Sequence, residues 1–151
     1  MPDTEVTPYI KRLADIKKQA TRQAGEIIEE LQNLIIPYVR DRQLYQQGID
    51  GKGERLQDYK PLTVIIKRAK GQPTDRTTLL DSGAFYRGFF ASSKNDLLVI
   101  TSKDSKTPDL LAKYGPDIFT LTVEHNKEVN EKIILPALIE WLLKQIDDLE
   151  L

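Results

Sequence analysis

Cysteine is absent from the 151-residue chain, and histidine occurs once, at His125. The absence of cysteine excludes disulfides, thiolate metal sites and cysteine nucleophiles. A single histidine excludes sites built from several imidazoles, and no nucleophile-elbow motif offers a serine for His125 to activate. Because His125 begins a strongly charged stretch, we expect it to be exposed. We therefore expect no catalytic residue, no metal site, no cofactor and no enzymatic activity.

Charge of one sign is not in excess, and long apolar runs are missing. Lys and Arg number 22 against 23 Asp and Glu, which gives a net charge of −1. This balance excludes a protein that coats nucleic acid through a generally basic surface, and it excludes an overall attraction to anionic membranes. The richest apolar stretch, residues 133–139, is far shorter than the roughly 20 residues of a spanning helix. The acidic start of the chain lacks the apolar core of a secretory signal, so we expect a protein made in a cytoplasm, with no membrane partner.

The first third of the chain carries one helical pattern. Over residues 8–46, apolar residues recur every three or four positions, which predicts a long amphipathic helix. Pro37 is expected to kink or split this helix, because proline has no N–H to donate. Two interpretations stay open: the helix packs on the core of its own chain, or its far half packs on a neighbouring subunit.

Residues 47–80 form a long connection that is rich in glycine and proline and has no sustained period. Between Pro61 and Lys70, the proline favours the first turn of a short helix, whereas the β-branched run 63–66 favours a strand; we favour the helix. The spacing required of a calcium loop or a phosphate loop is not present around Gly51. Connections of this length are uncommon in compact domains, so we expect an interaction loop.

Short strands and helices are predicted in the remainder of the chain. Aromatic and branched residues predict strands at 84–91, 96–101 and 118–122, with a hairpin loop between the first two. Helices are predicted from Thr107 as N-cap to Gly115, and from Thr122 as N-cap to about residue 149.

Two further local features are expected in this part. Pro136 should kink the final helix. Asp81, Ser82 and Gly83 form a structural turn, in which an Asp or Ser oxygen bonds the backbone two residues on and Gly83 takes a positive φ.

These patterns predict an α+β fold in a single domain that spans residues 1–151. It consists of a helical arm at 8–46, a long interaction loop at 47–80, and a sheet with helices at 81–151. The sheet is expected to be small and antiparallel, with about three strands, and the C-terminal helix is expected to pack on it.

Charge is uneven along the chain although its total is balanced. Residues 47–80 carry seven Lys or Arg against four Asp or Glu, a balance of +3, and residues 111–151 carry four Lys against eight acidic residues, a balance of −4. Unlike surfaces on one chain are typical of heterologous interfaces, although both can also be solvated faces. A third alternative is contact between nucleic acid and the cluster Lys67, Arg68 and Lys70, which lacks interleaved aromatic residues.

The candidate interface therefore joins a basic set to an acidic set, with apolar residues beside the acidic one. The basic set is Lys52, Arg55, Lys60, Lys67, Arg68, Lys70 and Arg76; the acidic set is Glu124, Glu128 and Glu131; the apolar residues are Phe119 and Leu121.

Several motifs also occur in a characteristic order. A Gly-rich turn at 48–54 precedes Tyr59-Lys60-Pro61-Leu62-Thr63 with Lys67, and then Leu79-Leu80-Asp81-Ser82-Gly83-Ala84-Phe85 opens the strand pair. Leu111-Ala112-Lys113-Tyr114-Gly115 and Ile118-Phe119-Thr120-Leu121-Thr122 lead into the last helix. Over residues 26–146 this order resembles the virion-morphogenesis family of tailed phages, the tail-completion proteins that include the Mu-type G protein.

The resemblance implies a structural protein of the virion, assembled in the host cytoplasm at the head–tail junction. It implies a ring of identical subunits, a hexamer or a dodecamer, around the DNA channel. The partners would be other phage neck or tail proteins, with passive proximity to the DNA, and no cofactor. The alternative function is a cytoplasmic adaptor or nucleic-acid accessory module without catalysis.

Overall fold

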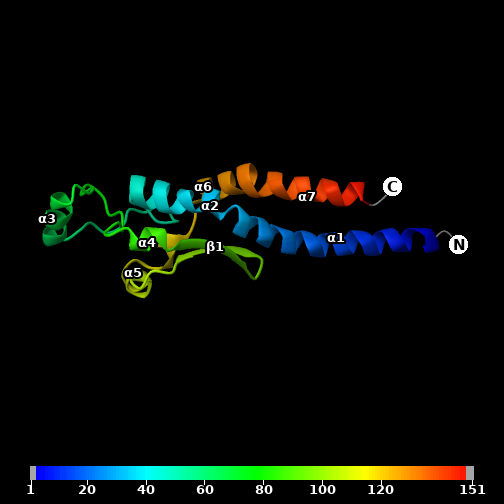
Figure 1. The fold of residues 1–151 in the computed structure, drawn as a ribbon, viewed down its shortest axis with the longest axis horizontal. Helices are drawn as coiled ribbons and strands as arrows, with labels where there is room; N and C mark the ends of the chain where they lie inside the picture. Colours follow the sequence, from blue (N-terminus) through cyan, green and yellow to red (C-terminus); the bar gives the residue numbers. More distant parts are fainter. Residues whose placement is uncertain (1–2, 149–151) are drawn as a thin grey trace.

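The computed structural model describes residues 3–148. In chain order its elements are α1 (Asp3–Glu30), α2 (Gln32–Pro37), η1 (Tyr38–Gln47), α3 (Pro61–Ala69), α4 (Ala84–Arg87), β1 (Phe89–Lys94), β2 (Leu97–Ser102), α5 (Thr107–Tyr114), η2 (Pro116–Phe119), α6 (Val123–Val129), η3 (Asn130–Ile134) and α7 (Leu135–Asp147). The molecule is elongated: α1 and α7 lie side by side as a two-helix arm at one end, and α3 lies at the opposite end (Figure 1).

The N-terminal helical pattern is real but is interrupted earlier than predicted. Leu31, with φ −101° and ψ 13°, separates α1 from α2, so the break precedes Pro37 by six residues. After Pro37 the chain winds more widely, as the π-helix η1, which ends at Gly48 in the left-handed region at φ +64°. Proline cannot donate a backbone hydrogen bond, and the change of winding begins at the residue that follows it.

The sheet has two strands among the described residues, not three. β1 pairs with β2 in antiparallel register from Phe89 opposite Ser102 to Lys94 opposite Leu97. Asn95 and Asp96 form a two-residue turn with φ of +51° and +62°, which suits the right-handed twist of the hairpin. The predicted third strand at 118–122 is wrong, because Pro116 starts the 3₁₀-helix η2 there. Residues 84–87, predicted as strand, form the short helix α4 after the turn at Gly83.

The last helix begins as predicted but is not continuous. Thr122 caps α6 by accepting a hydrogen bond from the His125 N–H at 3.1 Å. The π-helical segment η3 then lies just before Pro136, whose ring occupies the first turn of α7. Rather than lying on the sheet, α7 runs back along α1, while α1 and α2 cover β1 (Figure 1).

Two other expectations for local structure have definite outcomes. The 47–80 connection contains the short helix α3, as favoured, and one isolated bridge between Ile49 and Arg55. Thr107 is not an N-cap: Lys106 holds that position, and the Thr107 hydroxyl donates to the Ser102 carbonyl at 3.1 Å. The helix α5 does end at Gly115, which has φ +84°.

The core lies in the middle of the molecule, where α2 and η1 meet the sheet, η2 and α6. Its fully buried apolar side chains are Ile35, Val39, Leu44, Ile118 and Val129. Beside them the rings of Phe85, Phe89 and Phe119 pack with centroids 5.1 to 5.7 Å apart. Within residues 3–148, no helix combines the length and the apolar character needed to cross a membrane.

Candidate interaction surfaces

The three predicted basic interface residues outside residues 60–70 all make contacts within their own chain. Arg76 donates from Nε to the Tyr45 carbonyl oxygen at 2.6 Å. Arg55 donates to the Asp75 carbonyl oxygen at 2.9 Å, although its side chain stays largely exposed. Lys52 Nζ lies 3.3 Å from an Asp117 carboxylate oxygen, so one contact between the basic and acidic segments forms inside a single copy.

The basic residues of α3 and of its two caps divide into an exposed group and one buried residue. Lys60, Arg68 and Lys70 are exposed, whereas Lys67 is only 7% exposed. Lys67 Nζ donates to Gln72 Oε1 at 3.2 Å and to the Leu80 carbonyl, and it lies 4.8 Å from the centroid of the Tyr59 ring. Lys67, which the sequence placed in the basic set of the interface, is therefore buried within its own chain, where these contacts attach α3 to residues 59, 72 and 80.

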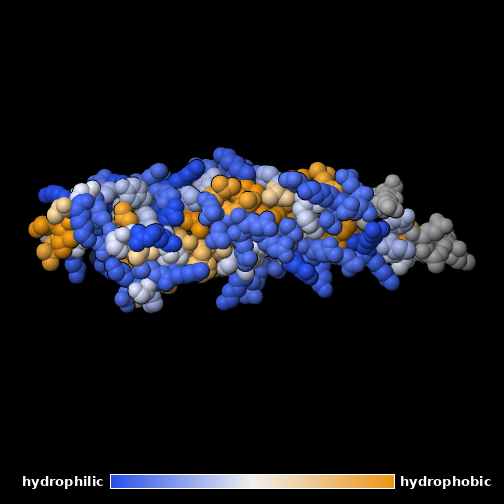
Figure 2. All heavy atoms as spheres, in the orientation of Figure 1, coloured by the Kyte–Doolittle hydropathy of each residue, from blue (hydrophilic) through white to orange (hydrophobic). Residues whose placement is uncertain are grey.

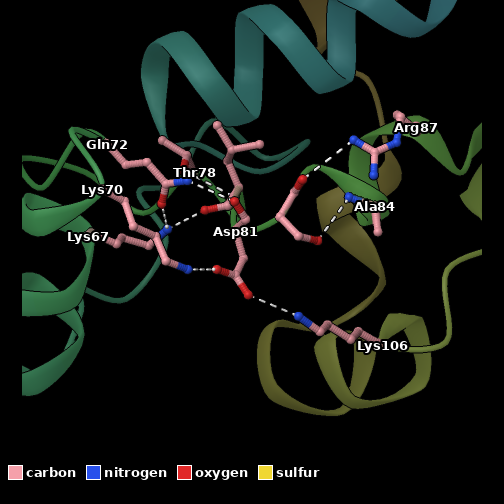
Figure 3. Close-up of polar contacts among 10 residues, drawn as sticks. Lys67, Lys70, Gln72, Thr78, Asp81, Ala84, Arg87 and Lys106 are labelled. Atoms are coloured by element: carbon pink, nitrogen blue, oxygen red, sulfur yellow. Dashed lines mark hydrogen bonds and ion pairs between the residues drawn. The ribbon is translucent and has the colours of Figure 1, made fainter.

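Asp81 is the centre of an ion-pair cluster that joins three segments. Its carboxylate accepts from Lys70 Nζ at 2.6 Å and from Lys106 Nζ at 3.0 Å, so α3 and the residue before α5 both meet the Asp81 turn (Figure 3). These two hydrogen bonds lower the pKa of Asp81 from 3.8 to about 2. Lys106 was missed by sequence reasoning, because it lies 25 residues after Asp81 and outside both charged segments.

The Asp81-Ser82-Gly83 segment is also the expected turn. Ser82 Oγ accepts from the Ala84 N–H at 3.3 Å, which is the predicted bond two residues on. Gly83 has φ +89°, a conformation that side chains with a Cβ rarely adopt. This turn directs the chain into α4.

A cavity of about 380 Å³ opens between α3, residues 79–85 and α5. Its walls include the apolar side chains Ile66, Leu79, Phe85, Leu110 and Tyr114. Its charged lining consists of Lys67, Lys70, Lys106 and Asp81. We call this feature the lysine cavity.

The predicted acidic residues differ in what they contact. Glu128 is half-buried and lies 3.3 Å from Arg42 and 3.4 Å from Lys132, and it also accepts from the Tyr38 hydroxyl. Glu131 lies 4.0 Å from Lys127 one helical turn away. Glu124 is exposed in the first turn of α6. Glu124 and Glu131 are therefore accessible to another molecule, whereas Glu128 is partly covered.

The apolar residues predicted for the interface belong to the protein interior. Phe119 is buried against Phe85 and Phe89, so its assignment to an interface is wrong. Leu121 is half-buried and packs against the same core. The sequence predicts a strand at 118–122, whereas Ile118 and Phe119 are buried residues of the 3₁₀-helix η2.

His125 is buried, not exposed as predicted. Its Nδ1 lies 2.8 Å from Oε1 of Gln43, and its ring packs edge-on against Tyr38. Gln43 is itself fully buried; its Nε2 donates to the Thr120 carbonyl at 2.8 Å and its Oε1 accepts from the Thr122 N–H at 3.0 Å. The pair joins η1 to the start of α6, and no local sequence signal marked either residue as a partner of the other.

Exposed apolar side chains lie at the α3 end of the molecule and along the two-helix arm (Figure 2). At the α3 end they are Leu62, Ile65 and Ile66, which we call the α3 patch. On the two-helix arm they form an outer stripe on α7 and cover the first turns of α1. The arm residues are Leu135, Ile139, Leu143 and Ile146 on α7, and Val6, Tyr9, Ile10 and Leu13 on α1.

No family model, no curated protein and no solved structure matches this chain. Within residues 3–148, no group of three or more His, Cys, Asp or Glu side chains is arranged to hold a metal ion. Three features of the described structure are candidates for a function: the α3 patch, the lysine cavity and the apolar stripe of the arm.

Proposed function

We propose that the chain is a structural assembly subunit that joins copies of itself end to end, and that it acts at the head–tail junction of a tailed phage. The observation that carries the proposal is the exposed apolar surface on two separate parts of an elongated molecule, the α3 end and the two-helix arm. Monomeric proteins rarely leave large contiguous apolar patches in water, and such patches mark interaction sites.

The kind of assembly follows from the difference between these two surfaces. One is a short helix flanked by lysines and arginine, and the other is a pair of long helices. Contact between two different surfaces is heterologous, and repeated heterologous contacts close into a ring when the rotation allows it. A hexameric or dodecameric ring is the form that the resemblance to tail-completion proteins implies.

The exposed residues Lys60 and Arg68 support a position close to DNA without requiring a dedicated DNA site. Arg68 lies on α3, and Lys60 and Lys70 are its N-cap and C-cap, so a ring would place such residues from every copy in the same region. The same residues favour the second candidate function, a nucleic-acid accessory module. That function requires DNA binding by the isolated chain that weakens steeply with salt, whereas the assembly subunit does not.

The function is tested by removing the protein from the phage that encodes it. We expect filled heads and free tails that fail to join, and we expect added purified protein to restore joining. Antibody labelling of complete virions should mark the junction. Normal tailed particles made without the protein would contradict the proposal.

A further inference from the structure

Lys67 is a buried cation without a counter-ion among the described residues. Its ammonium group contacts an amide oxygen, a backbone carbonyl and an aromatic face, all of which are neutral. Burying a charge without a partner of opposite sign is costly, and neutral acceptors offset only part of that cost. An anionic group that entered the lysine cavity would complete the neutralisation.

The rest of the cavity's charge has the same sign. Lys70 and Lys106 share the single carboxylate of Asp81, so the lining carries three ammonium groups and one carboxylate. Each lysine offers three N–H donors, and Lys70 and Lys106 each use one on Asp81. Both side chains are about half exposed, so the remaining donors are available to a ligand.

Beneath the lysines the walls are apolar, which restricts the ligand further. Ile66, Leu79, Phe85 and Leu110 line a space of about 380 Å³, within the size range of ligand pockets. A ligand that matches both the lysines and the apolar walls of the cavity carries carboxylates and aliphatic groups. An acidic peptide that contains leucine has this chemistry.

The chain itself contains such a peptide, which begins at the last residue of α7. Residues 147–151 read Asp-Asp-Leu-Glu-Leu, with three carboxylate side chains and two leucines. α7 ends at the far end of the arm from α3 (Figure 1). The four residues beyond α7 reach at most about 14 Å. The helix alone is about 20 Å long, so the peptide of one copy does not return to its own cavity.

We infer that the lysine cavity of one copy binds the acidic segment 147–151 of a second copy. This inference rests on the proposed function, because it names the contact through which the copies join. The same approach brings Leu143 and Ile146, at the exposed end of α7, toward Leu62 and Ile65 of the α3 patch. Apolar contact then supplies the affinity, while the carboxylates select the register.

The test measures binding of a synthetic peptide, not assembly. A fluorescently labelled peptide of residues 143–151 is titrated with the full chain carrying D147N, D148N and E150Q, whose own segment no longer competes. We expect saturable binding that weakens as salt is raised. A peptide with the three acidic residues replaced by amides should not bind, and a peptide with Leu149 and Leu151 replaced by serine should bind more weakly.

Two cavity variants with opposite effects locate the site. K70Q with K106Q should weaken binding about 5- to 30-fold, whereas D81N, which removes the competing carboxylate, should strengthen it about 2- to 10-fold. The matched control is K94Q with K127Q, two exposed lysines outside the cavity, which should leave the affinity unchanged.

The inference is overturned if the peptide does not bind, or if it binds equally well to all cavity variants. Equal binding of a peptide with the same residues in scrambled order also overturns it, since the cavity would then accept any acidic peptide. If the peptide binds but the chain never forms a closed assembly, the docking site is supported and the ring is contradicted. If a ring forms but the peptide does not bind, the ring is supported and the docking site is contradicted.

Discussion

Replacing Leu62 by glutamate separates a role in assembly from a role in folding. Leu62 lies in the first turn of α3 and is 69% exposed, so the folded subunit gains little from its side chain. An acidic residue in the first turn is also favourable toward the helix dipole. We therefore expect L62E to leave the free energy of unfolding within about 0.5 kcal/mol of the parent value.

The expected effect on assembly is much larger. Full burial of a leucine side chain contributes about 1.5–3 kcal/mol, and the exposed two-thirds of Leu62 would contribute about 1–2 kcal/mol at a contact. A carboxylate left without a partner in that contact costs about 1–3 kcal/mol more. The total of about 2–5 kcal/mol corresponds to an association about 30- to 4,000-fold weaker for each contact.

Leu97 provides a matched control for this experiment. It is the same residue type, it is 67% exposed, and it lies at the start of β2, away from the α3 patch. Sedimentation velocity should show parent-like assembly for L97E and dissociated subunits for L62E, with equal urea unfolding midpoints for both. The reasoning is refuted if L62E, still folded, assembles as well as L97E.

Three further predictions concern the subunit itself. Q43L should lower the free energy of unfolding, measured by urea titration, by about 3–5 kcal/mol. The reason is that the Thr120 carbonyl, the Thr122 N–H and His125 would stay buried without their hydrogen-bond partner. The control Q46L, on the exposed side of η1, should change the free energy of unfolding by less than about 0.5 kcal/mol. G83V should lower the free energy of unfolding by about 1–3 kcal/mol, because a side chain with a Cβ is strained at φ +89°. An unchanged melting temperature would disprove this strain. The pKa of Asp81 is lowered from 3.8 to about 2, so its stabilising contribution is complete above pH 4 and is lost as the pH falls toward 2. Between pH 5 and pH 2, the melting temperature of D81N should therefore fall by less than that of the parent. An equal fall in both proteins would contradict the ion-pair cluster.

The elements that depend on local residue patterns were predictable from sequence. The period of α1, the cap at Thr122, the end of α5 at Gly115 and the turn at Gly83 each follow from a few neighbouring residues. The predicted third strand failed for a related reason, because the branched residues 118–122 have strand propensity but follow a proline that starts η2. Propensity is a weak guide where tertiary packing decides the conformation.

The candidate surfaces were only partly predictable, because they depend on contacts between distant residues. The sequence indicated a basic connection, but it did not show that Lys67 would be buried or that Lys106 would complete the cluster at Asp81. It also did not show that His125 would meet Gln43, which is 82 residues away. Charge counted along a chain does not indicate which side chains share a face.

Assembly is the central claim, and the mass of the purified protein in solution tests it most directly. Sedimentation equilibrium or native mass spectrometry should give one dominant species whose mass is a whole multiple of 17.3 kDa, and that species should persist on dilution as a closed ring does. A mass of 17.3 kDa at every concentration would contradict the claim, and an open series of increasing sizes would contradict ring closure.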